Sequence, residues 1–174
     1  MKVNTFLMTS FLKAKLVDEE NAKKAYEAAE KNEHSFFAEL IDMKLVKAAD
    51  VYAHLSKLFG IEFTEVNINQ IQDAIVNKVD NTFLMEIRAV PLRLDANKLI
   101  VLIDTPFNIS NCNLVRYYLD YNIEPKLVTK ENLDTILNAI QNKDRRIRAI
   151  EELQISENKV IKKTGEELYL SFLL

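Results

Sequence analysis

The side chains most able to do chemistry in this 174-residue chain are two histidines, one cysteine and one aspartate beside a turn. His34 and His54 have no cysteine or carboxylate cluster at ligand spacing, so we expect structural histidines rather than metal ligands. Cys112 cannot form an internal disulfide, and we interpret it as a free structural thiol, with reactivity at a helix N-terminus as the alternative. Asp104 ends a predicted strand, where α/β sheets often hold a catalytic carboxylate. We instead favour a role in bonding backbone donors at that turn.

The glycine content excludes the common nucleotide sites. A P-loop requires G-x-x-x-x-G-K-[ST] and a dinucleotide fold requires G-x-G-x-x-G, because only glycine lets the backbone approach phosphates so closely. The chain has two glycines, Gly60 and Gly165, and neither precedes Lys-Ser or Lys-Thr. We therefore expect no catalytic residue, no cofactor and no binding or hydrolysis of ATP by this chain alone.

Composition narrows the class of protein further. The hydrophobic content of 48% and the charged content of 28% are typical of a globular protein. A net charge of -3 argues against binding to nucleic acid, which usually requires a basic face. No run of 18 apolar residues is present, so we expect no insertion into a membrane. One cysteine suits a reducing cytoplasm.

The elements that must position these side chains begin with a helical region over residues 1–59. Apolar spacing predicts four helices, with Asp18 as an N-cap and Gly60 as the end of the fourth. Residues 11–17 repeat as residues 40–46 at an offset of 29, each ending in Lys-Leu-Val. Because two copies are too few for a solenoid, we predict a compact four-helix unit.

Residues 60–141 are predicted to form a small α/β subdomain. The stretch Ala89–Asp104 contains two apolar runs around the polar break Asp95–Asn97, which indicates a hairpin. Alternation of Leu92 and Leu94 with Arg93 predicts one buried face, and Leu99–Ile103 predicts a strand covered on both faces. A third strand over 123–128 with Pro125 suits a sheet edge. The fold class is thus α+β: the four-helix repeat, then a three-stranded sandwich in the order β-β-α-β-α.

Residues 142–174 are predicted to be a charged helical extension with an apolar tail, LYLSFLL, which serves as a linker or the start of a further domain. Within it Arg148 and Glu152 have the spacing of an ion pair. We expect a hairpin around Thr164-Gly165.

The order of elements resembles the N-terminal domain of type II secretion and type IV pilus assembly ATPases, the secretion-ATPase E-type N-terminal domain. The resemblance covers about residues 6–141. It is carried by the Leu16-Val17 and Leu45-Val46 turns, LSKLFGIEF at 55–63, RAVPLRLDANKLIVLIDTP at 88–106, Tyr121–Pro125 and Thr129–Leu133. The family-motif residues are Arg88, Pro91, Leu92, Asp104 and Pro106, with Thr105 inserted before the proline.

The resemblance implies a bacterial, cytoplasmic docking and regulatory domain, peripheral to the inner membrane, that contacts an inner-membrane platform or assembly protein and oligomerises through a parent ATPase. Some family members bind cyclic di-GMP in the helical repeat through arginine, glycine and glutamine. The corresponding positions here are Phe6 and Ser35, Met8 and Phe37, Lys15 and Lys44, and Ala29 and Leu58. None matches, so we expect no binding of cyclic di-GMP.

Three hypotheses follow, in decreasing order: a non-enzymatic docking domain, a ligand-sensing module that binds a small molecule or nucleotide in the helical repeat, and a small enzyme using Asp104. The partner-docking candidates are Phe6, Phe11, Phe36 and Phe37, because the repeat holds more apolar residues than so small a unit can bury. The LYLSFLL tail is the rival contact.

Overall fold

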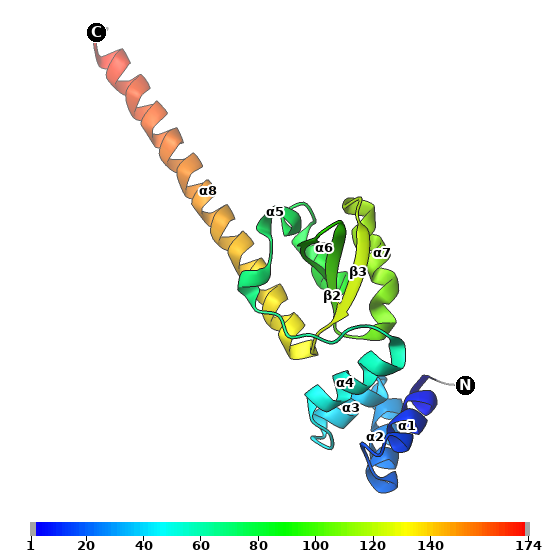
Figure 1. Cartoon of the computed structure of the whole chain (residues 1–174). Coiled ribbons are helices and arrows are strands. Elements are labelled where there is room, and N and C mark those ends of the chain that lie inside the picture. Colours follow the sequence, from blue (N-terminus) through cyan, green and yellow to red (C-terminus); the bar gives the residue numbers. More distant parts are fainter. Residues whose placement is uncertain (1–2, 173–174) are drawn as a thin grey trace. The chain divides into compact units, whose positions relative to one another are not determined.

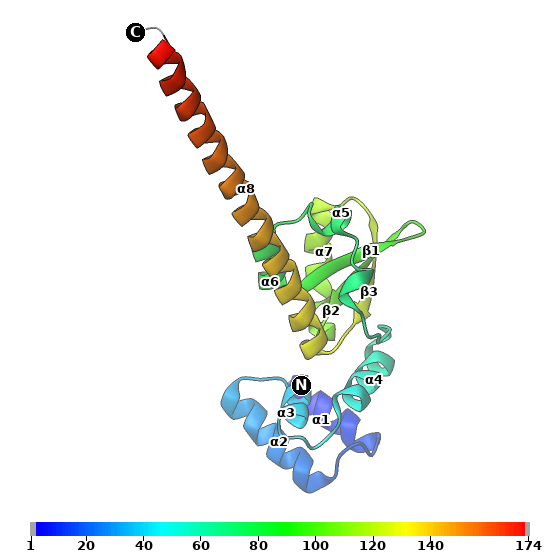
Figure 2. The same cartoon turned by 90° about the vertical axis from the view of Figure 1, so that its left-hand side faces the viewer.

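The structure is a computed structural model that describes residues 3–172, with side chains described except at 158–161 and 163–172. The chain separates into two compact units, Met1–Asp134 and Thr135–Leu174. The first unit contains a helical region and a three-stranded sheet (Figures 1 and 2). These findings confirm the predicted α+β fold class.

Four helices form the N-terminal region as predicted: α1 (Val3–Lys13), α2 (Glu19–Asn32), α3 (Phe36–Asp42) and α4 (Ala48–Phe59). α2 begins at Asp18, whose carboxylate accepts a hydrogen bond of 2.9 Å from the backbone N–H of Asn21. α4 ends at Gly60, which has φ of 67° and supplies the left-handed residue that closes a helix. α2 packs against α1 and α3, and buried side chains of all four helices form the core of this region.

An extended connector leads from Gly60 to the sheet. Phe63 forms an isolated parallel bridge with Leu127, so the connector pairs briefly with the third strand. The short helices η1 (Ile68–Gln70), α5 (Asp73–Val76) and α6 (Asn81–Ile87) follow. α5 and α6 pack against the first strand.

The sheet consists of β1 (Ala89–Asp95), β2 (Lys98–Ile103) and β3 (Asn122–Leu127), with β2 in the centre. β1 is antiparallel to β2 and β3 is parallel to it. Burial of Leu99–Ile103 confirms the prediction of a strand covered on both faces. The alternation predicted for β1 is wrong, because a bulge between Pro91 and Arg93 shifts the register and leaves Leu94 half-buried.

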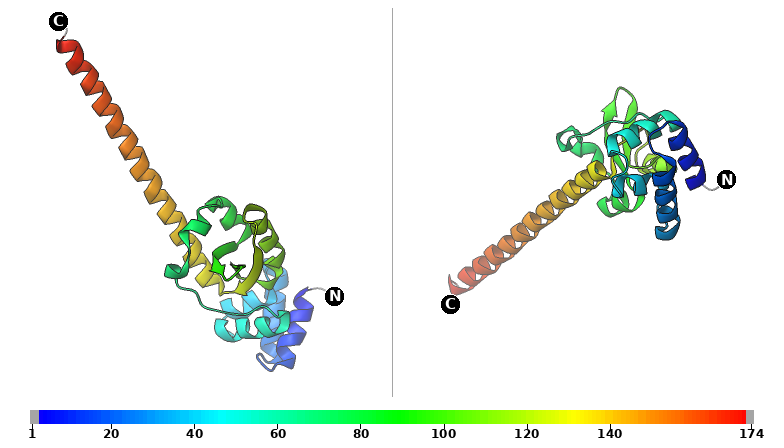
Figure 3. Two further views of the ribbon diagram at one scale, coloured as in Figure 1. Left: turned by 45° about the horizontal axis from the view of Figure 1, so that its top comes forward. Right: turned by 90° about the horizontal axis from the view of Figure 1, so that it is seen from below.

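Within the described residues, three further helices follow β2, two before β3 and one after it. η2 (Pro106–Asn108) leads into α7 (Ile109–Tyr118), which contacts both β1 and β3. α8 (Lys130–Phe172) begins after Thr129, whose hydroxyl accepts a hydrogen bond of 3.1 Å from the backbone N–H of Asn132. Figure 3 shows α8 as one continuous helix. The predicted hairpin around Thr164-Gly165 is therefore wrong: one glycine costs a helix only about 1 kcal/mol.

Candidate functional site

The two turns of the helical repeat have the same backbone conformation. Lys15 and Lys44 both have φ of 56°, in the left-handed region. The following N–H groups bond back across each helix end, Leu16 to the Phe11 carbonyl at 3.2 Å and Leu45 to the Leu40 carbonyl at 2.9 Å. This is the Schellman arrangement, in which glycine is usual. The 29-residue repeat is thus present in three dimensions.

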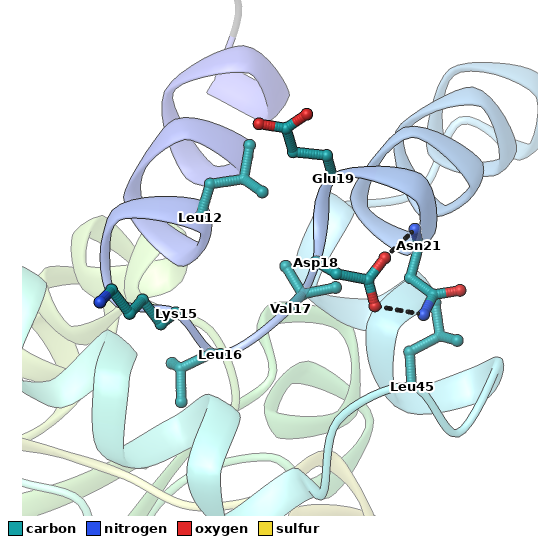
Figure 4. A pocket seen from close by; sticks show the side chains of 8 residues that line it. All are labelled: Leu12, Lys15, Leu16, Val17, Asp18, Glu19, Asn21 and Leu45. Carbon is teal, nitrogen blue, oxygen red and sulfur yellow. Dashed lines mark hydrogen bonds between the residues drawn. The ribbon is translucent and has the colours of Figure 1, made fainter.

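A cavity of about 560 Å³ lies at these turns (Figure 4). Leucine and valine side chains form its apolar part, and charged groups stand at the first turn; its lining consists of Leu12, Lys15, Leu16, Val17, Asp18, Glu19, Asn21 and Leu45. Asp18 accepts hydrogen bonds from Asn21 N at 2.9 Å and Asn21 Nδ2 at 2.6 Å. These two bonds lower the pKa of Asp18. The carboxylate is therefore engaged in capping α2. Lys15 is the one cationic side chain among the residues that line the cavity.

Most of the positions that carry cyclic di-GMP contacts in the resembled family do not line this cavity. Of the eight positions, only Lys15 lines it. Phe37 is 5% exposed and belongs to the core. No arginine lines the cavity to clamp a phosphate with two parallel hydrogen bonds. The lining thus combines one cationic side chain with apolar ones, and the absence of cyclic di-GMP binding stays a prediction.

The four predicted docking residues occupy two different environments. Phe11 and Phe36 are fully buried and contact each other edge to face, with ring centroids 5.8 Å apart. Phe37 is also in the core, against Tyr52. Phe6 alone of the four is at the surface, 38% exposed. Docking itself stays a prediction, but a partner could reach only Phe6 directly.

Phe6 belongs to an aromatic cluster that joins the helical region to the sheet region. Its ring lies 6.5 Å from that of Phe59 in α4, and Phe59 lies 5.4 Å from Phe107 in η2. Phe107 is 41% exposed and Phe59 is half-buried. We call Phe6, Phe59 and Phe107 the aromatic cluster. The aromatic cluster was not predicted from the sequence, because its three residues lie on separate elements.

A second exposed apolar surface lies on α7. Leu114, Tyr117 and Tyr118 are exposed, and Tyr117 is 94% exposed. Tyr118 also contacts the ring of Phe83 at a centroid distance of 5.0 Å. The sequence signal for this surface was the pair of adjacent aromatic residues Tyr117 and Tyr118 near the end of the helix.

The carboxylate of Asp104 is buried and accepts hydrogen bonds from side chains in a partly exposed polar network rather than from the turn backbone, so its predicted role is wrong. Arg88, at the end of α6 with φ of 50°, donates from Nε and Nη2 to Asp104 Oδ2 at 2.8 and 2.5 Å. Arg88 Nη2 also donates to Asp134 Oδ1 at 2.7 Å, and Lys130 Nζ donates to Asp134 Oδ2 at 2.9 Å. Burial would raise the pKa of Asp134, but these two donors outweigh burial and lower it.

Tyr52 of α4 connects this network to the helical region. Its hydroxyl donates to the Asp104 carbonyl at 2.8 Å and accepts from the Lys130 backbone N–H at 3.1 Å. Its ring stacks on Phe63 at a centroid distance of 5.6 Å. Burial raises the pKa of Tyr52, so the hydroxyl stays protonated. Thus one hydroxyl holds the end of β2, the start of α8 and the repeat together.

The other family-motif residues are structural. Pro91, Leu92 and Pro106 are buried: two lie at the bulge of β1 and one in the turn after β2. The motif therefore surrounds the Arg88–Asp104 pair. These residues stabilise the sheet and its turns, and they do not form a site open to solvent.

The histidines and the cysteine also have structural surroundings. His34 Nδ1 lies 3.0 Å from Glu39 Oε1, and His54 Nε2 lies 2.8 Å from Ser10 Oγ. Burial raises the pKa of the Cys112 thiol to about 11. In the described part of the chain no cluster of metal-ligating side chains is present. Likewise, no helix in residues 3–172 is long and apolar enough to cross a membrane.

Comparison with known proteins identifies the family of this chain and solved structures with the same fold. The MshEN domain model matches residues 59–147, about half of the chain. Type IV pilus assembly ATPase PilB of Pseudomonas aeruginosa is 25% identical over 134 residues, 77% of this chain and 24% of that protein. The chain therefore spans about a quarter of the length of this curated relative.

Two solved structures share the fold. MshE, solved with cdg (cyclic di-GMP), superposes with a TM-score of 0.63 at 13% identity, covering 76% of this chain and 96% of that one. The N-terminal domain of XpsE superposes with a TM-score of 0.59 at 15% identity, covering 79% and 95%. The resemblance to the N-terminal domain of type II secretion and type IV pilus ATPases is confirmed.

Proposed function

The chain belongs to the MshEN domain family, and on this premise we propose that it is the docking and regulatory N-terminal domain of a pilus or secretion ATPase. Its partner is the cytoplasmic part of an inner-membrane platform or assembly protein, which holds the chain in the cytoplasm beside the membrane. Hydrolysis of ATP belongs to another part of the parent protein. The observation that carries the proposal is the family match over residues 59–147, together with the similarity to PilB.

The aromatic cluster is the contact surface that we assign to this docking. Exposed aromatic side chains supply large apolar area at low conformational cost, and such residues dominate binding energy at protein interfaces. Phe6 and Phe107 are both about 40% exposed, and Phe59 joins them. Because the cluster spans the repeat and the sheet region, a partner seated on it would contact both.

Calorimetric titration of this chain with the cytoplasmic part of the assembly protein tests the proposal. We expect Phe107→Ala and Phe6→Ala each to weaken binding at least about tenfold, or about 1.4 kcal/mol. The exposed polar residue Asn113 on α7 provides a matched control, and Asn113→Ala should bind as the unmodified chain does. Circular dichroism of each variant separates lost binding from lost folding.

Two results would redirect the assignment. If Tyr117→Ala weakens binding and the cluster variants do not, the α7 surface is the interface. If deletion of residues 156–174 leaves a folded protein that no longer binds, the tail is the interface. Absence of binding by the unmodified chain at about 100 µM, a free energy weaker than about -5.5 kcal/mol, would overturn the docking proposal.

Ligand sensing is the second candidate, favoured by the cavity at the repeat turns. The cavity lies in residues 12–45, outside the matched range of 59–147. The lining contains Lys15 as its cation and four apolar side chains. It would therefore suit regulation by a small molecule other than a nucleotide. Protection of the chain against thermal unfolding by a small anionic, partly apolar compound, lost in Lys15→Ala, would support this function.

A further inference from the structure

The middle of α8 exposes a line of large apolar side chains. Ile147, Ile150 and Leu153 are 42%, 55% and 63% exposed. They are three residues apart, so they form an oblique ridge of the kind that packs between the ridges of a second helix. A helix of this length gains most of its stability from such packing rather than from intrinsic propensity.

Charge is distributed unevenly along the same stretch. Residues 143–148 contain four basic side chains and one acidic side chain, giving a net charge of +3. Residues 151–157 contain three acidic side chains and no basic one, giving -3. The two charged blocks lie on either side of Ile150, which makes the segment complementary to a reversed copy of itself.

We propose that this segment pairs with the same segment of a second copy of the chain in antiparallel orientation, centred on Ile150. In this register Ile150 faces its equivalent, Ile147 faces Leu153 of the second copy, and Arg148 faces Glu152 of the second copy. The basic block of each helix then opposes the acidic block of the other. This inference is independent of the docking proposal, since it concerns the second unit alone.

The two charged blocks favour the antiparallel orientation of the helix pair over the parallel one. Packed helices have axes about 8–10 Å apart, which is comparable to the Debye length of about 8 Å at physiological salt, so opposed blocks interact. A parallel, in-register pair would place +3 against +3 and -3 against -3. Within one helix Arg148 pairs with Asp144, at 2.9 Å between Nη2 and Oδ2, rather than with Glu152 as the sequence predicted. Glu152 is therefore available to an opposing helix.

Sedimentation equilibrium of the 174-residue chain measures the association. We expect a dimer whose dissociation constant rises between about 50 and 500 mM salt, because salt screens the opposed blocks. Ile150→Glu places two like charges at the centre of the pair and should weaken the dimer at least tenfold. The exposed residue Asn142 allows a control with the same change in charge, and Asn142→Glu should have little effect.

Charge reversal tests the register. Arg148→Glu alone and Glu152→Arg alone should each weaken the dimer, and the double variant should restore it, because each new pair is again opposite in sign. A chain that stays monomeric at about 200 µM and low salt would overturn the proposal. So would a double variant no tighter than either single one.

Disulfide trapping tests the orientation. In a Cys112→Ala background, we expect Ile147→Cys and Leu153→Cys chains to cross-link when mixed, and each to cross-link poorly alone. Efficient cross-linking of the Ile147→Cys chain with itself would establish parallel packing and refute the proposal.

Discussion

Replacing Tyr52 by phenylalanine tests whether one hydroxyl joins three segments of the first unit. The ring remains, so stacking on Phe63 is kept and only the oxygen is lost. Two hydrogen bonds disappear, from the hydroxyl to the Asp104 carbonyl and from the Lys130 N–H to the hydroxyl. Each bond contributes about 1 kcal/mol, and a buried carbonyl left unpaired costs up to about 3 kcal/mol. We therefore expect a loss of about 2–3 kcal/mol.

Chemical denaturation of both proteins measures this difference. Tyr117→Phe is the matched control, because its hydroxyl belongs to a side chain that is 94% exposed, and it should change stability by less than about 0.5 kcal/mol. Hydrogen exchange should also show faster exchange of the amides at the start of α8 in the Tyr52→Phe protein. If the free energy of unfolding of Tyr52→Phe lies within about 0.5 kcal/mol of that of the unmodified chain, the hydroxyl does not hold these segments together.

Val101→Asp places a carboxylate at a fully buried position of β2 and should unfold the first unit, at a cost above about 4 kcal/mol; a cooperative melting transition in circular dichroism would contradict this. Asp134→Asn should destabilise the chain at neutral pH. Because the pKa of Asp134 is lowered in the folded state, the difference should be constant above the ordinary value of 3.8 and should close as pH falls below it, as followed by urea denaturation. The Cys112 thiol should resist alkylation at pH 8 until the chain is unfolded, since its pKa is raised to about 11; fast labelling of the folded chain would refute its burial. Calorimetry should find no dissociation constant for cyclic di-GMP below about 10 µM, or about -6.8 kcal/mol, and a saturable heat would instead promote the sensing function.

Local periodicity was sufficient to predict most of the fold. The four helices, the hairpin and the edge strand each carry a signal within a few residues, such as Asp18 before α2 or Pro125 in β3. The bulge at Leu92 carries no such signal, because it depends on the fit of β1 to β2. The continuous α8 was missed because Gly165 looks like a turn residue when the rest of the helix is ignored.

The site was harder to predict than the fold. Periodicity marks Phe6 and Phe36 equally as apolar helix residues, and only packing shows that one is exposed and the other buried. The Arg88–Asp104 pair joins residues 16 positions apart across the end of β2. Sequence singled out both residues through the family motif but gave no reason for them to meet. Long-range pairs of this kind arise from topology, which a single sequence does not reveal.

The two outer strands of the sheet each contain a proline, Pro91 in β1 and Pro125 in β3. Proline has no N–H to donate, and the bulge next to Pro91 further disrupts the outer edge of β1. On the other side, Phe63 covers part of β3 through its bridge to Leu127. The sheet is therefore a poor template for strand exchange or amyloid-like stacking. We therefore expect copies of this domain not to aggregate through their strands even when crowded together.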